Sequence, residues 1–180
     1  MRETMLDFAH EYRRHKNLAD RAMASLSDEA FFHRPAETVN PIALIVKHLA
    51  GNLVSRWTDF LTSDGDKPSR DRDNEFQLGP QDTRPNLMAA WERGWKTLFD
   101  ALDGLTDADL GKTVMIREEK HTVRQALLRN ATHTAYHVGQ ILYLARMLSP
   151  DSPWLTIAPG QSRTHSRGAY LRPQQETRRR

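Results

Sequence analysis

Residues 122–148 carry the pattern that most constrains the fold, because large apolar side chains recur there at steps of three and four. This spacing puts them on one face of an α-helix, and such a face must be buried against other elements. Thr122 and Gln125 form a capping-box pattern at the start, and Pro150 stops the helix. The face comprises Ala126, Asn130, His133, His137, Ile141, Leu144 and Leu148. We therefore expect a long helix that carries two histidines into a buried interface.

Three more segments have helical periodicity: residues 3–26, 41–61 and 83–102. The second is apolar around much of its circumference, which predicts burial on several sides. Asn40 followed by Pro41 is a typical start signal, with Asn as the cap and Pro at the first helical position. Residues 27–35 predict a short helical turn, and residues 113–122 predict a small β-hairpin. Four long helices in a chain of 180 residues predict one all-α domain.

Histidines suggest a metal site in this domain. His133 and His137 stand four positions apart, so one turn of helix brings both rings to one point. A buried polar group without a partner costs roughly 1–3 kcal/mol, and a shared metal ion removes that cost for both rings. His48 falls on the buried side of its helix and supplies a third ligand from a facing helix. The chain has no cysteine, so a transition metal must use nitrogen and oxygen ligands. Three imidazoles leave open positions for water or substrate, as in catalytic sites.

Other interpretations compete with this one. Two buried histidines can be hydrogen-bonded core residues that bind no metal. His15 lies on the apolar face of its helix and is the best candidate for a fourth ligand, although its charged neighbours favour partial exposure. Asn130 and Gln140 are candidates to orient the ligands. His165 lies in a polar setting, so we expect it to bind no metal. The polar segment at residues 63–82 is long enough to be functional and is a candidate cover for the site.

Two segments, KHLAGNLVSRWTDFLTSDG at residues 47–65 and HTAYHVGQILYLARML at residues 133–148, resemble the DinB superfamily, and most closely its DUF1572 group. The resemblance extends from the first helix to about Ser162, and the HxxxHxGQI element is its most specific part. It implies an up-down-down-up four-helix bundle over residues 1–162, followed by a basic tail at residues 163–180. It also implies a homodimer that binds nickel, zinc or iron through the histidine on the second helix and the two on the fourth. Those positions match His48, His133 and His137.

The resemblance also implies a function. Some relatives resemble thiol-dependent enzymes, including bacillithiol S-transferases and mycothiol-dependent isomerases. A metal-dependent transferase of this kind would present a low-molecular-weight thiol as a thiolate nucleophile. The sequence offers no obvious general base near the ligands, so a non-catalytic metal-binding or stress-associated protein is an alternative. A hydrolase that activates water on the same metal is another.

Charge and hydropathy bear on partners and location. The net charge is +3, and much of the positive excess lies in residues 163–180. A basic tail can contact phosphates, but this one has a single aromatic residue and no nucleic-acid-binding motif, which favours a solvated terminus. No stretch approaches the roughly 20 apolar residues of a membrane span. The N-terminus lacks the apolar core of a signal peptide, so we expect a cytoplasmic protein.

Overall fold

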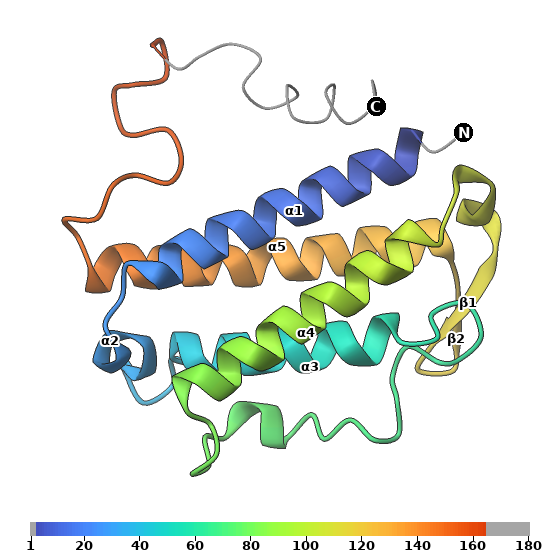
Figure 1. Ribbon diagram of the computed structural model, residues 1–180, viewed down its shortest axis with the longest axis horizontal. Coiled ribbons are helices and arrows are strands. Elements are labelled where there is room, and N and C mark those ends of the chain that lie inside the picture. The colour runs from blue at the N-terminus through green and yellow to red at the C-terminus, as the bar shows by residue number, and fades with distance from the viewer. Residues whose placement is uncertain (1–2, 165–180) are drawn as a thin grey trace.

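The computed structural model describes residues 3–164, and four long helices dominate it (Figure 1). They are α1 (Glu3–Ala24), α3 (Ile42–Trp57), α4 (Arg84–Asp103) and α5 (Val123–Leu148). The shorter elements are α2 (Asp28–Phe32), the 3-10 turns η1 (Asn74–Phe76) and η2 (Asp107–Gly111), and the strands β1 (Thr113–Ile116) and β2 (Glu119–Thr122). The chain is therefore mostly helical, with a small two-stranded sheet. Most of the predicted basic tail, including His165, lies outside the described residues.

The long helices run in two directions. In Figure 1, α1 and α5 run one way along the molecule, and α3 and α4 run the other way. The most extensive helix contacts are those of α3 with α4 and of α1 with α5. Because α3 and α4 are neighbours that run the same way, the chain must travel back along their length between them. Residues 58–83 make this return, and η1 within them lies against α3.

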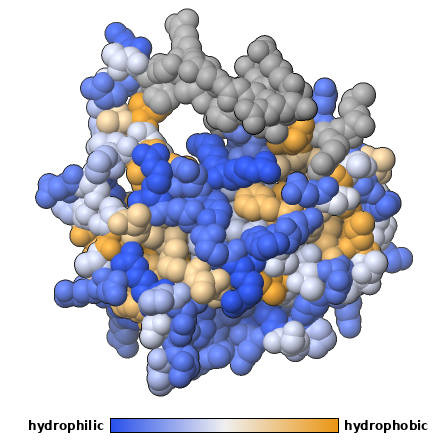
Figure 2. All heavy atoms as spheres, viewed as in Figure 1, coloured by the Kyte–Doolittle hydropathy of each residue, from blue (hydrophilic) through white to orange (hydrophobic). Residues whose placement is uncertain are grey.

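The core forms where the apolar faces of the long helices meet. Thirteen of the 16 residues of α3 are buried, as its apolar circumference predicts. Trp91 and Trp95 of α4 are fully buried, and Gly94 lets the two helices approach, since a Cβ there would lie 3.0 Å from the carbonyl oxygen of Ala50. The face in Figure 2 is mostly hydrophilic with small hydrophobic patches, as expected of amphipathic helices. No helix within residues 3–164 has the length and apolar character needed to cross a membrane.

The second predicted helix differs from expectation at both ends. Pro41, and not Asn40, is its N-cap, because the ψ of Pro41 is extended at 162°. No side chain caps this end. The helix also stops earlier than predicted, at Trp57, because Thr58 is extended and Asp59 adopts a left-handed φ of 48°. The predicted capping box at the start of α5 is confirmed.

The predicted hairpin is confirmed, with Thr113 paired to Thr122 in an antiparallel register. Its two turn residues, Arg117 and Glu118, have φ values of 54° and 63°, which is the type I′ geometry that suits strand twist. Neither is glycine, so a contact from outside must hold the turn. The Asp64 carboxylate accepts hydrogen bonds from both backbone N–H groups, at 2.9 and 2.8 Å. This contact ties the connection between α3 and α4 to the hairpin.

Candidate metal centre

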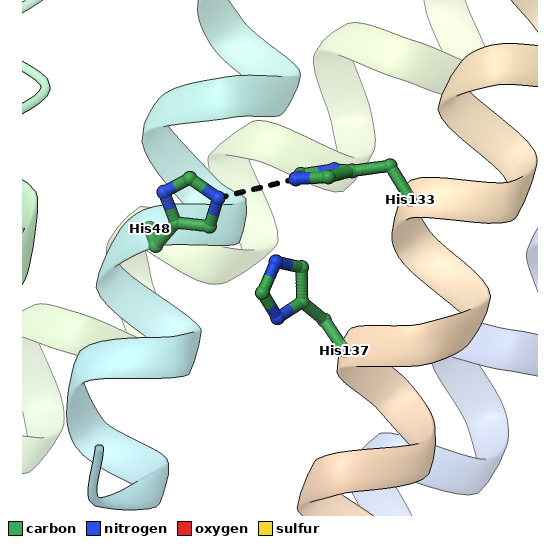
Figure 3. Close-up of side chains that lie close together, drawn as sticks. All are labelled: His48, His133 and His137. Atoms are coloured by element: carbon green, nitrogen blue, oxygen red, sulfur yellow. Dashed lines mark hydrogen bonds between the residues drawn. The ribbon is translucent and has the colours of Figure 1, made fainter. Parts of the chain in front are cut away.

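His48, His133 and His137 come together between α3 and α5 (Figure 3). One ring nitrogen of each lies within 4.8 Å of a nitrogen of each of the others. The Nε2 atoms of His48 and His133 are 3.2 Å apart and form a hydrogen bond, which the dashed line in Figure 3 marks. The part of the chain that the structure describes contains one such group of histidine, aspartate or glutamate side chains, and it is this one. The structure thus brings together the three residues that the helical periodicities select.

Glu75, on η1, orients His48. Its Oε2 lies 2.8 Å from His48 Nδ1, and both side chains are buried. Arg70 donates two hydrogen bonds of 2.7 Å to the same carboxylate. Burial would raise the pKa of Glu75, but the hydrogen bonds from Arg70 and His48 outweigh it and hold that pKa below its usual range. An ionised Glu75 accepts a hydrogen bond from the Nδ1–H group of His48, which leaves the lone pair of His48 Nε2 directed at His133.

Two neighbours fix this arrangement. Gly51, one turn after His48 on α3, leaves room for the carboxylate. A Cβ at position 51 would overlap Glu75 Oε1 and lie 2.9 Å from Glu75 Cδ. Glycine in a helix interior costs about 1 kcal/mol relative to alanine, so the space it leaves for Glu75 accounts for its presence. On the other side, Phe76 stacks on the His48 ring with the centroids 4.8 Å apart.

His133 and His137 are held in neutral form. His137 Nδ1 lies 2.8 Å from Gln140 Oε1, the contact expected of an orienting residue. Because that oxygen only accepts, Nδ1 carries the proton and Nε2 is free to bind. Burial, together with the nearby histidines, lowers the pKa of His133 to about 3. Burial, partly offset by the Gln140 hydrogen bond, lowers the pKa of His137 to about 4. Both rings are therefore neutral at pH 7, the form that binds metals.

The donor set fits a divalent transition metal. Two nitrogens that each lie about 2.0–2.1 Å from a tetrahedral zinc ion are about 3.3 Å apart. The distance between His48 Nε2 and His133 Nε2, 3.2 Å, is close to this value. At the same distance, and with no ion between them, one Nε2 donates a hydrogen bond to the other. His133 Nδ1 is buried without a hydrogen-bond partner, so the polar interaction of that ring is on its Nε2 side.

A family model described as "Protein of unknown function (DUF1572)" matches residues 2–161 of the chain. The chain belongs to the DUF1572 family. No curated protein and no solved structure matches it. Family membership by itself assigns no activity, so the function of this DUF1572 protein must be argued from its site.

A cavity of about 520 Å³ opens beside the histidines of the DUF1572 protein. His48 and His133 form part of its wall, and the rest comes from α3, α5, the connection between α3 and α4, and the hairpin. The volume is typical of small-molecule sites, which span about 300–1,000 Å³. No aspartate or glutamate lines it. Two of the three candidate ligands, His48 and His133, therefore face a space that a small molecule can enter.

Two residues selected from the sequence have other roles. His15 is not part of the histidine group, and its Nε2 lies 4.0 Å from Glu11 on its own helix. Asn130 orients none of the three histidines. Its Oδ1 accepts hydrogen bonds from the Tyr12 hydroxyl at 3.0 Å and from Trp57 Nε1 at 3.2 Å. Asn130 is thus the centre of a buried structural network, and Trp57 belongs to the core.

The sequence analysis missed Glu75 and Arg70 because they lie in a segment without periodicity. One available signal was Gly51, a glycine inside an apolar helix and one turn from His48, which marks a close approach. A second was Arg56, two turns after His48 on a buried face of α3.

Proposed function

We propose that this DUF1572 protein binds a divalent transition-metal ion through His48, His133 and His137 and uses it in thiol chemistry. The observation that carries the proposal is the convergence of three imidazole nitrogens beside an open cavity. A purely structural site is normally closed by a fourth protein ligand. No fourth histidine or carboxylate joins the group within residues 3–164, which favours a catalytic role over a non-catalytic one.

We also propose that the four long helices form a DinB-like, up-down-down-up bundle. The shared direction of α1 with α5 and of α3 with α4 supports this topology. So does the long return between α3 and α4, which a bundle with parallel neighbouring helices requires.

A thiol suits the site better than water does. An ion held by neutral imidazoles keeps its full positive charge and lowers the pKa of a thiol, which is about 8.5 in free cysteine. No carboxylate lines the cavity to act as a general base, and a thiol needs less help than water to lose its proton. In the transfer, the thiol releases its proton to solvent and its sulfur forms a bond to an electrophilic carbon. The leaving group departs with the bonding electron pair.

Three residues hold the histidine rings in place: Glu75, Gln140 and Tyr136. Glu75 and Gln140 fix the orientation of two of the three rings. Tyr136 packs against His133 and His137, with ring centroids 5.2 and 4.5 Å apart. These contacts keep the nitrogens converged on one side and leave the cavity side open to a thiol.

The test begins with elemental analysis of the purified protein, for which we expect about one metal ion per chain. The protein is then loaded with cobalt and titrated with cellular low-molecular-weight thiols. A sulfur-to-metal charge-transfer band supports the proposal. Protein that binds no divalent metal overturns it. Metal-loaded protein that gives no band with any thiol leaves metal binding intact and refutes the thiol chemistry.

A further inference from the structure

The cavity beside the histidines is strongly basic. Five of its lining residues are arginines: Arg56, Arg70, Arg72, Arg117 and Arg129. Glu75 pairs with Arg70, and Asp66 pairs with Arg117 at 2.9 Å, so carboxylates behind the wall offset part of this charge. No carboxylate lies on the wall itself. His48 and His133 therefore open onto a space with a positive surface.

Arg56 is the least expected of these residues. It is 7% exposed, and its Nε is buried with no hydrogen-bond partner. Among the described residues it forms no ion pair, although a buried guanidinium without an anion is costly. Burial, and then repulsion by Arg129 and Arg70, lower its pKa to about 10, so it stays charged at pH 7. The C-terminal end of α3 favours a cation there but supplies no acceptor to Nε.

The surroundings hold Arg56 in this position. A Cβ on Gly65 would lie 2.9 Å from Arg56 Cδ and 3.0 Å from its Nε, so any other residue at position 65 would displace the guanidinium. Gly65 is itself fixed: its N–H donates to the carbonyl oxygen of Met115 at 2.8 Å, and its carbonyl oxygen accepts from Ser55 Oγ at 3.2 Å. The connection and the hairpin are thus locked around the stem of Arg56.

We propose that this cavity binds a small anionic molecule through its carboxylate or phosphate groups, with Arg56 as the principal contact and Arg129 facing it from α5. A guanidinium presents forked N–H donors that match both kinds of oxyanion. The volume of about 520 Å³ accommodates a small organic anion as well as a simple ion. An anion supplies the partner that Arg56 lacks and relieves the repulsion among the arginines. The site stands on these observations alone and does not require a metal ion at the histidines.

The test uses the full-length protein as purified, titrated by calorimetry with tricarballylate in one arm and with inorganic phosphate in the other. Elemental analysis before and after each titration shows whether the probe has removed metal. Arg56→Met and Arg129→Met each delete one wall charge from a different helix. Arg93→Met is the matched control, because Arg93 is an exposed arginine of α4 that does not line the cavity.

We expect at least one probe to bind, and its affinity to fall by about tenfold or more in Arg56→Met and Arg129→Met but not in Arg93→Met. Binding of tricarballylate alone assigns a carboxylate ligand, and binding of phosphate alone assigns a phosphate ligand. Without a probe, Arg56→Met should be at least as stable to heat as the wild type, because it removes an uncompensated buried charge. The proposal is overturned if neither probe binds at millimolar concentrations, or if the control variant loses as much affinity as Arg56→Met.

Discussion

Gly51→Ala should separate the function of the site from the stability of the fold. The new methyl group would overlap the carboxylate oxygen of Glu75 that Gly51 now accommodates. The atoms that must move belong to the end of a side chain and not to backbone. We therefore expect the protein to fold, with Glu75 displaced from His48.

We expect Gly51→Ala to change the free energy of unfolding little and to weaken metal binding clearly. Alanine in a helix interior is more favourable than glycine by about 1 kcal/mol. This gain offsets part of the loss of the contacts between Glu75, Arg70 and His48, so the free energy of unfolding should change by no more than about 1 kcal/mol. Loss of the residue that orients a metal-binding histidine typically lowers metal affinity about 10–100-fold. Metal binding should therefore fall by roughly 1.4–2.7 kcal/mol.

The assay is competition for metal against a chromophoric chelator, combined with chemical denaturation. Glu75→Gln should reproduce the loss of metal affinity, since it weakens the same contact without adding volume. Gly139→Ala is the matched control, because a Cβ at position 139 of α5 meets nothing within 4 Å. Gly94→Ala should lower the stability of the fold and leave metal affinity unchanged, which is the opposite of the result expected for Gly51→Ala. Its Cβ would lie 3.0 Å from the backbone oxygen of Ala50, which destabilises the protein without touching the site.

Folded Gly51→Ala protein that binds metal as tightly as Gly139→Ala does would contradict this prediction. That result would mean that Glu75 has no part in orienting His48. Unfolding of Gly51→Ala under native conditions would mean that Glu75 has a larger structural role than its contacts indicate.

Four further predictions concern the ligands, the core, the tail and pH. His137→Ala should reduce bound metal to background while the exposed His33→Ala should not, and equal metal contents by elemental analysis would contradict the assignment. Asn130→Ala should lower the free energy of unfolding by roughly 2–4 kcal/mol in urea, because buried donors lose their acceptor, and a loss within error of zero would show that the network is dispensable. Removal of residues 163–180 should preserve a cooperative thermal transition, since the sequence of this segment has no apolar periodicity with which to add to a core, and its disappearance would show that the tail is structural. Metal-free protein should lose stability as the pH falls from 6.5 towards 4, because the lowered pKa values of His133 and His137 let the unfolded chain bind protons that the folded chain does not. A flat unfolding free energy across that window would contradict the burial of these rings.

The sequence predicted best those features that depend on neighbours along the chain. His133 and His137 share one helix, so their spacing alone determines that their rings are adjacent. The start of α5 was also predictable, because the capping box at Thr122 is a local contact. Pro41 was harder to place, since its φ of −66° suits both a cap and the first helical position.

Features that depend on the path of a loop could not be predicted from the sequence in this way. Glu75 reaches His48 only because residues 58–83 return along α3, and the sequence of that segment has no period that would indicate its course. The position of Arg56 likewise depends on Gly65 and on the hairpin, which come from two distant parts of the chain. Its burial could be inferred from the periodicity of α3, but the cavity that it faces could not.

The site is built from two kinds of sequence: the packed helices, and the connection that returns between α3 and α4. The histidines stand on helices whose other faces build the core, so most substitutions around them would disturb folding. Arg72 is an exposed residue of the connection, where changes in composition and length are tolerated more easily, whereas the side chain of Arg70 is buried and holds Glu75. A relative could therefore alter this part of the cavity wall by changing Arg72 and its exposed neighbours, provided that it keeps the pair of Arg70 and Glu75 that orients His48.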